Sequence, residues 1–203
     1  MAEPRRRWGW HELDRRWADR LVADAGIAPG QLVLDIGAGT GIITASLVAA
    51  GARVIAVELH PDRVKVLRRR FTDEPVTVIQ VDARALRLPR RPFSVVANPP
   101  YHLTTTLVRR LTHPGSALVD AHLVSQAAAV GRLAEAGVKR GRNGRARFVI
   151  GAGRPIPRRA FRPPPRVDSR VLIIDRVGTT DRTRRPTPPT PQPGRNRPTT
   201  GGP

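Results

Sequence analysis

A near-continuous apolar run at residues 31–36 leads directly into a glycine-rich turn at residues 37–41, and this pairing limits the fold more than any other feature. Such a run is typical of a strand that is buried on both faces of a parallel sheet. Residues 42–50 then have a helical pattern. Strand, glycine turn and helix in this order predict the start of a βαβ nucleotide-binding unit, and hence an α/β fold.

The turn itself reads Gly37-Ala38-Gly39-Thr40-Gly41. Its glycines allow the backbone to approach a ligand closely because no Cβ atom stands in the way. The G-x-G-x-G spacing differs from the dinucleotide-binding G-x-G-x-x-G pattern, and no lysine follows it as in a P-loop. A ligand without phosphates fits this turn better.

Three further apolar runs each end on a polar residue. The runs lie at residues 53–57, 76–81 and 93–97, and the polar residues that follow them are Glu58, Asp82 and Asn98. The carboxyl ends of parallel strands meet at one edge of a sheet, where ligands of open α/β folds bind. There the Glu58 carboxylate can accept hydrogen bonds from the ribose hydroxyls of an adenosine group, and the Asp82 carboxylate can accept one from its adenine amino group. A single loop acid is more simply a helix cap, but four features at one edge favour a cofactor site.

The last of these strands is stopped by Asn98-Pro99-Pro100-Tyr101. An exocyclic amine on a base is a poor nucleophile because its lone pair is delocalised into the ring. Two acceptors, the Asn98 side-chain oxygen and the Pro99 carbonyl, would draw it towards a reactive geometry. Tyr101 offers a face on which a flipped base can stack, a contact worth roughly 1–3 kcal/mol. The plainer interpretation is a turn with Asn98 as turn former and Tyr101 at its rim.

The composition limits the class of protein. A chain of 203 residues with 39% hydrophobic residues can bury one sizeable core. It has no cysteine, which excludes disulfides and thiolate metal sites, and we predict no metal site. No apolar stretch approaches the ~20 residues that span a bilayer, and the basic start at residues 5–7 does not lead into a signal-peptide core. We expect a soluble, cytoplasmic protein without a membrane partner.

The formal net charge of +20 indicates a polyanionic partner. Of the 36 basic residues only Lys65 and Lys139 are lysine, and arginine pairs bidentately with phosphate and stacks on bases. A GC-rich genome could explain arginine in place of lysine, but it does not explain the shortage of acids. The charge therefore favours nucleic acid as partner.

The rest of the chain completes one domain with two appendages. We expect helices at residues 11–25, 61–71, 102–111 and 126–136, a strand at 117–124, and an antiparallel closing pair at 147–152 and 170–175. Residues 1–10 form a basic and aromatic arm, residues 11–177 the domain, and residues 178–203 a tail. The tail holds seven Pro, seven Thr and five Arg with almost nothing apolar, which predicts disorder.

Two basic segments have open interpretations. Residues 139–147 form a glycine-spaced basic loop, which either contacts phosphate near the mouth of the site or is simply solvated. Residues 158–169 are made extended by their prolines. Phe161 in this segment is a large apolar residue among charges, so it is either an anchor or a wall for base stacking.

With these motifs, the chain resembles the ribosomal RNA adenine N6-methyltransferases, and among them most the macrolide-resistance group that modifies large-subunit ribosomal RNA. The likeness covers about residues 8–176. Its general marks are residues 35–41, Glu58, Asp82-Ala83 and residues 98–101, and its specific mark is the F-x-P-P-P-x-V-D-S run within residues 160–169.

The resemblance implies a Rossmann-like class I S-adenosylmethionine-dependent methyltransferase with a seven-stranded, mostly parallel sheet. It implies ribosomal RNA as partner, resistance to macrolide-type antibiotics as outcome, and a monomer. Asn98 and the carbonyl of Pro99 would hold the target N6, Tyr101 would stack on the adenine, and Phe161 would close its other face. The residues implied in binding S-adenosylmethionine are Trp10, His11, Asp35, Gly37, Ala38, Gly39, Glu58, Leu59, Asp82, Ala83 and Asn98.

The sequence differs from the family pattern at three places. Pro99 stands where members usually have Leu or Ile, and the usual N-terminal Gln-Asn-Phe clamp is replaced by Gly9-Trp10-His11. The helical C-terminal domain of the family is expected to be truncated, with the Pro/Thr/Arg tail in its place.

Three other functions compete with this assignment. The small-subunit rRNA adenine dimethyltransferases are disfavoured by the altered clamp and the truncated C-terminal domain. A protein glutamine methyltransferase shares Asn-Pro-Pro-Tyr, but the charge and the Phe161 segment disfavour it. A catalytically idle RNA-binding relative is disfavoured because Glu58, Asp82, Asn98 and Tyr101 are all intact.

Overall fold

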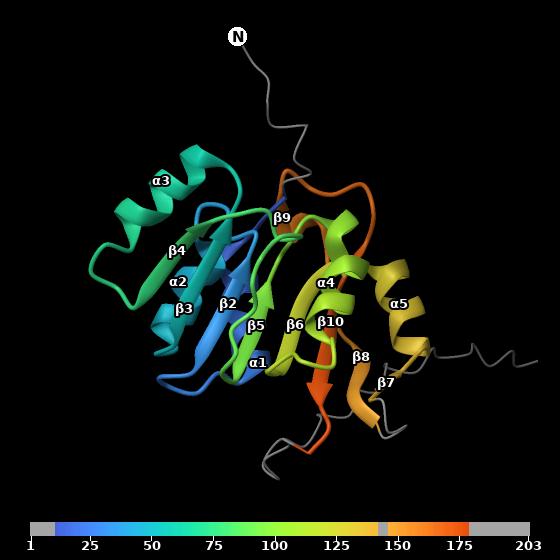
Figure 1. The fold of residues 1–203 in the computed structure, drawn as a ribbon. Helices are drawn as coiled ribbons and strands as arrows, with labels where there is room; N and C mark the ends of the chain where they lie inside the picture. Colours follow the sequence, from blue (N-terminus) through green and yellow to red (C-terminus); the bar gives the residue numbers. More distant parts are fainter. Residues whose placement is uncertain (1–10, 142–145, 179–203) are drawn as a thin grey trace, which may run out of the picture.

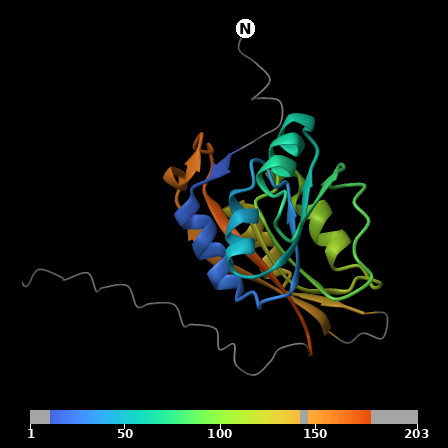
Figure 2. The ribbon, with the colours of Figure 1, turned by 90° about the vertical axis from the view of Figure 1, so that its left-hand side faces the viewer.

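A computed structural model describes residues 11–141 and 146–178, which build one eight-stranded sheet with helices on both faces (Figures 1 and 2). The strands of this sheet are β2 (Leu32–Ile36), β3 (Arg53–Glu58), β4 (Val76–Gln80), β5 (Phe93–Ala97), β6 (Leu118–Gln126), β7 (Val138–Arg140), β8 (Ala146–Ile156) and β10 (Ser169–Arg176). The helices are α1 (Arg15–Ala25), α2 (Ile42–Ala49), α3 (Pro61–Arg70), α4 (Thr104–Leu111) and α5 (Ala127–Glu135). Two 3₁₀ turns, η2 (Tyr101–Leu103) and η3 (Arg158–Ala160), and a separate pair of short strands, β1 (Glu12–Leu13) and β9 (Phe161–Arg162), complete the described elements.

The sheet has the strand order β4-β3-β2-β5-β6-β10-β8-β7. The first five strands are parallel to their neighbours, and β10, β8 and β7 are added in antiparallel fashion. This arrangement confirms the predicted α/β, Rossmann-like methyltransferase fold and its antiparallel closing pair. The order reverses at β2 and β5, and in such sheets ligands bind beside this reversal at the carboxyl ends of the strands.

The central strands are apolar throughout because helices cover both of their faces. All five residues of β2 and of β5 are buried. Val33 and Val96 pack against α1 and α2, whereas Leu34 and Val95 face the opposite way, towards α4. Continuous apolar runs, and not alternating ones, therefore mark these strands in the sequence.

The number of strands in the predicted sheet was wrong, because β7 makes eight in place of seven. This strand lies at the sheet edge, and it includes Lys139 and Arg140 from the stretch that we interpreted as a loop. An edge strand has one free side and needs few apolar residues, so its sequence carries little hydrophobic signal. The following strand, β8, also begins inside that stretch, at Ala146.

The first predicted helix begins later than expected. Asp14 caps α1 by accepting from the backbone N–H of Arg16 at 2.9 Å, so the helix starts at Arg15. The two residues before the cap form β1, which pairs with β9 through Leu13 and Phe161. This pairing joins segments about 150 residues apart and leaves no local periodic pattern.

Some predictions concern residues outside the described ones. The basic arm at residues 1–10 and, except for Gly178, the tail at residues 178–203 belong to this part, so both stay predictions. Within residues 11–141 and 146–178, no helix is long and apolar enough to cross a membrane.

Candidate active site

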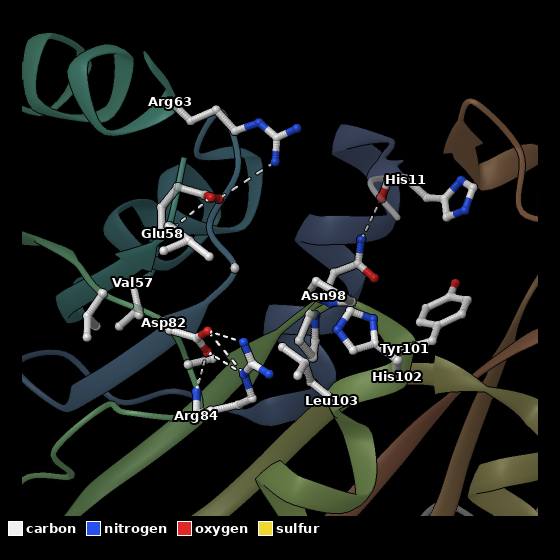
Figure 3. Close-up of a pocket in the computed structure, with 16 residues that line it drawn as sticks. His11, Val57, Glu58, Arg63, Asp82, Arg84, Asn98, Tyr101, His102 and Leu103 are labelled. Atoms are coloured by element: carbon white, nitrogen blue, oxygen red, sulfur yellow. Dashed lines mark hydrogen bonds and ion pairs between the residues drawn. The ribbon is translucent and has the colours of Figure 1, made fainter. Parts of the chain in front are cut away.

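A cavity of about 240 Å³ opens at the carboxyl edge of the parallel strands (Figure 3). The carboxyl ends of four strands contribute to its lining, because the chain leaves each of these strands at this edge, and each end contributes one of the four predicted features. They are Gly37 after β2, Glu58 at the end of β3, Asp82 after β4 and Asn98 after β5. The structure thus brings together the four features that the sequence predicted at one edge.

Glu58 ties the end of β3 to the glycine turn. Its side chain is only 6% exposed. One carboxylate oxygen, Oε1, accepts from the backbone N–H groups of Leu59 and His60 at 2.8 and 2.9 Å, and Oε2 accepts from that of Gly39 at 2.9 Å. A carboxylate has about four acceptor positions, so Glu58 can accept a further hydrogen bond from a ligand hydroxyl.

Asp82 is held by the arginine two residues further on. Arg84 donates its backbone N–H to Oδ1 at 2.8 Å, and its guanidinium reaches both carboxylate oxygens at 2.6–3.1 Å. These hydrogen bonds and the guanidinium charge hold the pKa of Asp82 below its usual range. Asp82 is therefore a fixed carboxylate at neutral pH, and a ligand amino group that bonds to it would share it with Arg84.

The amide of Asn98 has a defined orientation. Its Nδ2 donates to the main-chain carbonyl of His11 at 2.8 Å, as the dashed line in Figure 3 shows. A carbonyl can only accept, so this contact identifies the NH₂ end of the amide. The Oδ1 atom accepts no hydrogen bond from any residue in the described part of the chain, and it remains available to a donor in the pocket.

The glycine turn and the Asn-Pro-Pro-Tyr segment lie against each other. Gly37 has a φ of +79°, and a Cβ atom added there would come within 3.3 Å of the Pro99 Cα and 3.4 Å of the Pro100 Cδ. A side chain at this position would be strained and would push the two segments apart. This close approach places Asn98 beside the part of the pocket that the glycine turn lines.

The ring of Tyr101 lines the pocket and is fixed at its hydroxyl. The hydroxyl is 2.7 Å from the Ser169 Oγ, and Thr104 Oγ1 donates to the Tyr101 carbonyl at 2.8 Å. Burial raises the pKa of Tyr101 above its usual value, so the phenol stays protonated at neutral pH. Tyr101 is therefore suited to stacking and not to accepting a proton.

Phe161 lies elsewhere than the stacking interpretation requires. Its side chain is 1% exposed and packs with Leu13 and Val171 in the hydrophobic core, and it does not line the pocket. Side chains alternate along a strand, so β9 turns Phe161 inward and Arg162 outward. Of the two expectations for Phe161, this position fits an anchor; the role of closing the second face of an adenine is not supported.

Asp35 lies beside the glycine turn at a smaller cavity of about 30 Å³, which Ala38 and Gly39 also line. Its side chain is 1% exposed, and Oδ2 accepts from the Thr44 hydroxyl at 2.7 Å. Burial raises its pKa to about 7. The other oxygen, Oδ1, is buried and finds no hydrogen-bond partner among the described residues, so a donor supplied by a ligand would satisfy it.

The remaining predicted residues fall into two groups. His11, Leu59 and Ala83 line the main cavity, as does Pro99. Trp10 lies outside the described residues. Sequence reasoning missed Arg84 and Ser169; Ser169 belongs to the specific F-x-P-P-P-x-V-D-S run, but nothing in that run reveals its contact with Tyr101.

This donor set fits an adenosine-containing sulfonium cofactor. Two carboxylates, Glu58 and Asp82, lie at neighbouring strand ends, and Val57, Leu59 and Val81 add apolar surface to the same cavity. Asp35 Oδ1 has no hydrogen-bond donor among the described residues. No group of His, Cys, Asp and Glu in residues 11–141 and 146–178 could hold a metal ion.

Comparison with known proteins gives concordant matches. The family described as "Ribosomal RNA adenine dimethylase" matches residues 5–180. The "Ribosomal RNA small subunit methyltransferase A" of Synechococcus sp. (strain RCC307) is 36% identical over 193 residues, covering 84% of this chain and 69% of that protein. The "rRNA adenine N-6-methyltransferase" of Corynebacterium diphtheriae is 34% identical over 148 residues, covering 72% and 58%.

Two solved structures have the same fold. The "23S rRNA methyltransferase ErmE" superposes with a TM-score of 0.71 at 26% identity, covering 81% of this chain and 69% of that one. A dimethyladenosine transferase from Plasmodium falciparum superposes with a TM-score of 0.67 at 22% identity, covering 82% and 63%. The chain thus spans about two thirds of the length of the proteins that it matches.

Proposed function

Because this chain belongs to the ribosomal RNA adenine dimethylase family, whose methyl donor is S-adenosylmethionine, we propose that it methylates N6 of an adenine in small-subunit ribosomal RNA. The observation that carries the chemistry is the orientation of Asn98. Its Nδ2 donates to the His11 carbonyl, which leaves Oδ1 available as an acceptor for a substrate. An acceptor is what an adenine amino group requires, since that group is a donor.

Three carboxylates of the two cavities would bind and orient the cofactor. Glu58 would accept from the ribose hydroxyls of the cofactor, Asp82 from its adenine amino group, and the buried Asp35 would face its charged amino-acid end. When bound, S-adenosylmethionine would supply a methyl group from a sulfonium sulfur. The amine that takes the methyl gains the positive charge and then releases one N6 proton to solvent, so no strong base is needed.

The target adenine would be held by the segment that follows β5. Asn98 Oδ1 and the Pro99 carbonyl accept from its N6 amino group, and the ring of Tyr101 stacks on its face. Placement of the amine next to the donor, and not proton abstraction, accounts for the rate in this scheme. The neutral Tyr101 phenol is consistent with it, since no base is required.

The choice of small-subunit RNA rests on the names of relatives. Besides the Synechococcus protein, the "Ribosomal RNA small subunit methyltransferase A" of Alcanivorax borkumensis is 32% identical over 182 residues. This differs from the large-subunit substrate that we expected from the sequence. The small-subunit assignment was the alternative there, and the comparisons favour it.

Large-subunit RNA remains a second candidate, with macrolide resistance as its consequence. The likeness to the "23S rRNA methyltransferase ErmE", at a TM-score of 0.71, supports it. The altered N-terminal clamp, Gly9-Trp10-His11, supports it as well.

The experiment is methyl transfer from labelled S-adenosylmethionine to separated ribosomal RNAs, offered both protein-free and as subunits. The modified RNA is digested to nucleosides, and the label is mapped. We expect label in N6-methylated adenosine of the small-subunit RNA. Label only in large-subunit RNA would select the second candidate, and label confined to protein, or no transfer, would contradict both.

A further inference from the structure

We propose that residues 158–168, here called the arginine segment, form the surface that holds RNA phosphates beside the pocket. The inference rests on the proposed function, since it names where that RNA docks. The segment carries four arginines, Arg158, Arg159, Arg162 and Arg166, and one acid, Asp168. It lies between β8 and β10, and its β9 portion pairs with β1, next to the pocket residue His11.

The arginine segment is held in place at several points along its length. Asp14 donates its backbone N–H to the Ala160 carbonyl at 2.7 Å, and the Asp168 carbonyl accepts from the backbone N–H of Ala127 at 2.8 Å. Within the segment, Arg158 Nε donates to the Pro165 carbonyl at 2.8 Å. A surface held at both ends and across its middle presents its side chains in a fixed place and loses little conformational entropy when a ligand binds.

Three of the arginines are free to bind an anion. Arg159, Arg162 and Arg166 are exposed, and none of them makes a hydrogen bond or ion pair through its side chain with a described residue. Some arginines elsewhere do have an acid partner, as Arg154 has in Asp24 at 2.8 Å. An unpaired guanidinium on a fixed backbone is suited to a phosphate, which it can bind in bidentate fashion.

The arginine segment is also joined to the residues that would hold the adenine. His11 Nδ1 donates to the Pro163 carbonyl at 2.8 Å, and the carbonyl of His11 in turn accepts from Asn98. At the other end, Ser169 follows the segment directly and bonds to the Tyr101 hydroxyl. Figure 3 shows this part of the chain as the brown ribbon beside His11. Phosphates bound here would therefore have a fixed position relative to Asn98 and Tyr101.

The test compares two pairs of arginines in the full-length protein. R162A/R166A removes two charges from the arginine segment. R90A/R91A removes two exposed charges from the loop that enters β5, at the opposite edge of the sheet. For R162A/R166A we expect a KM for RNA about tenfold higher and an unchanged kcat at saturating RNA. A plot of log K for RNA binding against log salt concentration should have a slope smaller in magnitude by about 1.4, because two phosphate contacts are lost and each single-strand contact contributes about 0.7.

The controls separate docking from other effects. R90A/R91A should change the KM for RNA less than twofold, and R162K/R166K should keep most of the affinity because the charges remain. Affinity for S-adenosylmethionine, measured by calorimetry, should be the same in all variants. Equal increases in KM for both alanine pairs, or none for R162A/R166A, would overturn the assignment. Absence of any methyl transfer by the unaltered protein would instead overturn the proposed function, and RNA binding by anisotropy would still test the surface.

Discussion

At the scale of single residues, the contacts at the pocket assign different duties to Asn98 and Glu58. In the proposed function Asn98 would present an acceptor to the target amine, whereas Glu58 lies at the end of the strand where the cofactor ribose would bind. We expect Asn98→Ala to lower kcat roughly a hundredfold, because one positioned polar group at a reacting centre is worth about 10²–10³. Its affinity for S-adenosylmethionine should change little, as calorimetry would show.

Glu58→Ala should have the opposite profile. Loss of hydrogen bonds to a carboxylate costs about 1.5–3 kcal/mol each, which corresponds to at least a tenfold weaker affinity for S-adenosylmethionine. At saturating cofactor its kcat should fall much less than that of Asn98→Ala. Equal effects of the two substitutions on kcat and on cofactor affinity would contradict these roles.

Asp35 predicts a pH dependence of stability. Burial raises its pKa to about 7 in the folded protein, from 3.8 when unfolded. Between these values the folded state binds the extra proton, so the stability that Asp35 contributes falls as pH rises through this window. Asp35→Asn removes the titration but keeps an acceptor for Thr44.

The urea midpoints of the two proteins at pH 5 and pH 8 measure this effect. The urea midpoint of Asp35→Asn minus that of the unaltered protein should be more positive at pH 8 than at pH 5. The same difference between the proteins at both pH values would show that Asp35 does not titrate in this range.

At the scale of elements, the pairing of β1 with β9 makes Phe161 a structural residue. Its side chain is buried against Leu13. We expect Phe161→Ala to lower the free energy of unfolding by about 3–5 kcal/mol, the usual range for a buried aromatic, as measured by urea unfolding. Phe161→Leu should restore most of that stability and most of the activity. If Phe161→Leu had the stability of the unaltered protein but a much lower kcat, that result would instead indicate that Phe161 stacks on the target adenine.

The contact between β10 and the segment after β5 can be tested at the hydrogen bond between Tyr101 and Ser169. Tyr101→Phe and Ser169→Ala each remove the bond between the Tyr101 hydroxyl and the Ser169 Oγ. We expect each to lower kcat several-fold with unchanged cofactor affinity, and the double variant to be no worse than either, because both act through one contact. Ser116→Ala, which removes a buried hydroxyl near the start of β6, is the matched control. If the losses in kcat from Tyr101→Phe and Ser169→Ala added up in the double variant, the two residues would not act through this hydrogen bond.

The sequence predicted the elements that local patterns define. The strands β2 to β5 and the polar residues after them follow from apolar runs with clear ends, so these patterns alone place the cofactor edge. What they could not reveal depends on long-range contacts. The bond between His11 and Pro163 spans 152 positions, and that between Tyr101 and Ser169 spans 68. For the same reason the local pattern predicts helix at β1 and leaves a stacking role open for Phe161.

At the scale of the whole molecule, the net charge of +20 and the arginine segment act together. The overall charge would attract RNA from a distance, and it would do so less at high salt because ions screen it. The fixed arginines next to the pocket would then set where the RNA lies. The acceptor Asn98 and the carboxylates of the site come from the carboxyl edge of β2 to β5.

The proposed function requires one spatial arrangement, in which a cofactor lies along that edge and the Asn98 oxygen faces an adenine beside it. A crystal structure with S-adenosylhomocysteine, the product of the donor, tests it most directly. We expect the ribose hydroxyls at Glu58, the adenine amino group at Asp82, and the sulfur on the side of the pocket that Asn98 lines. Product bound away from Glu58 and Asp82, or an Asn98 side chain turned out of the pocket, would contradict it.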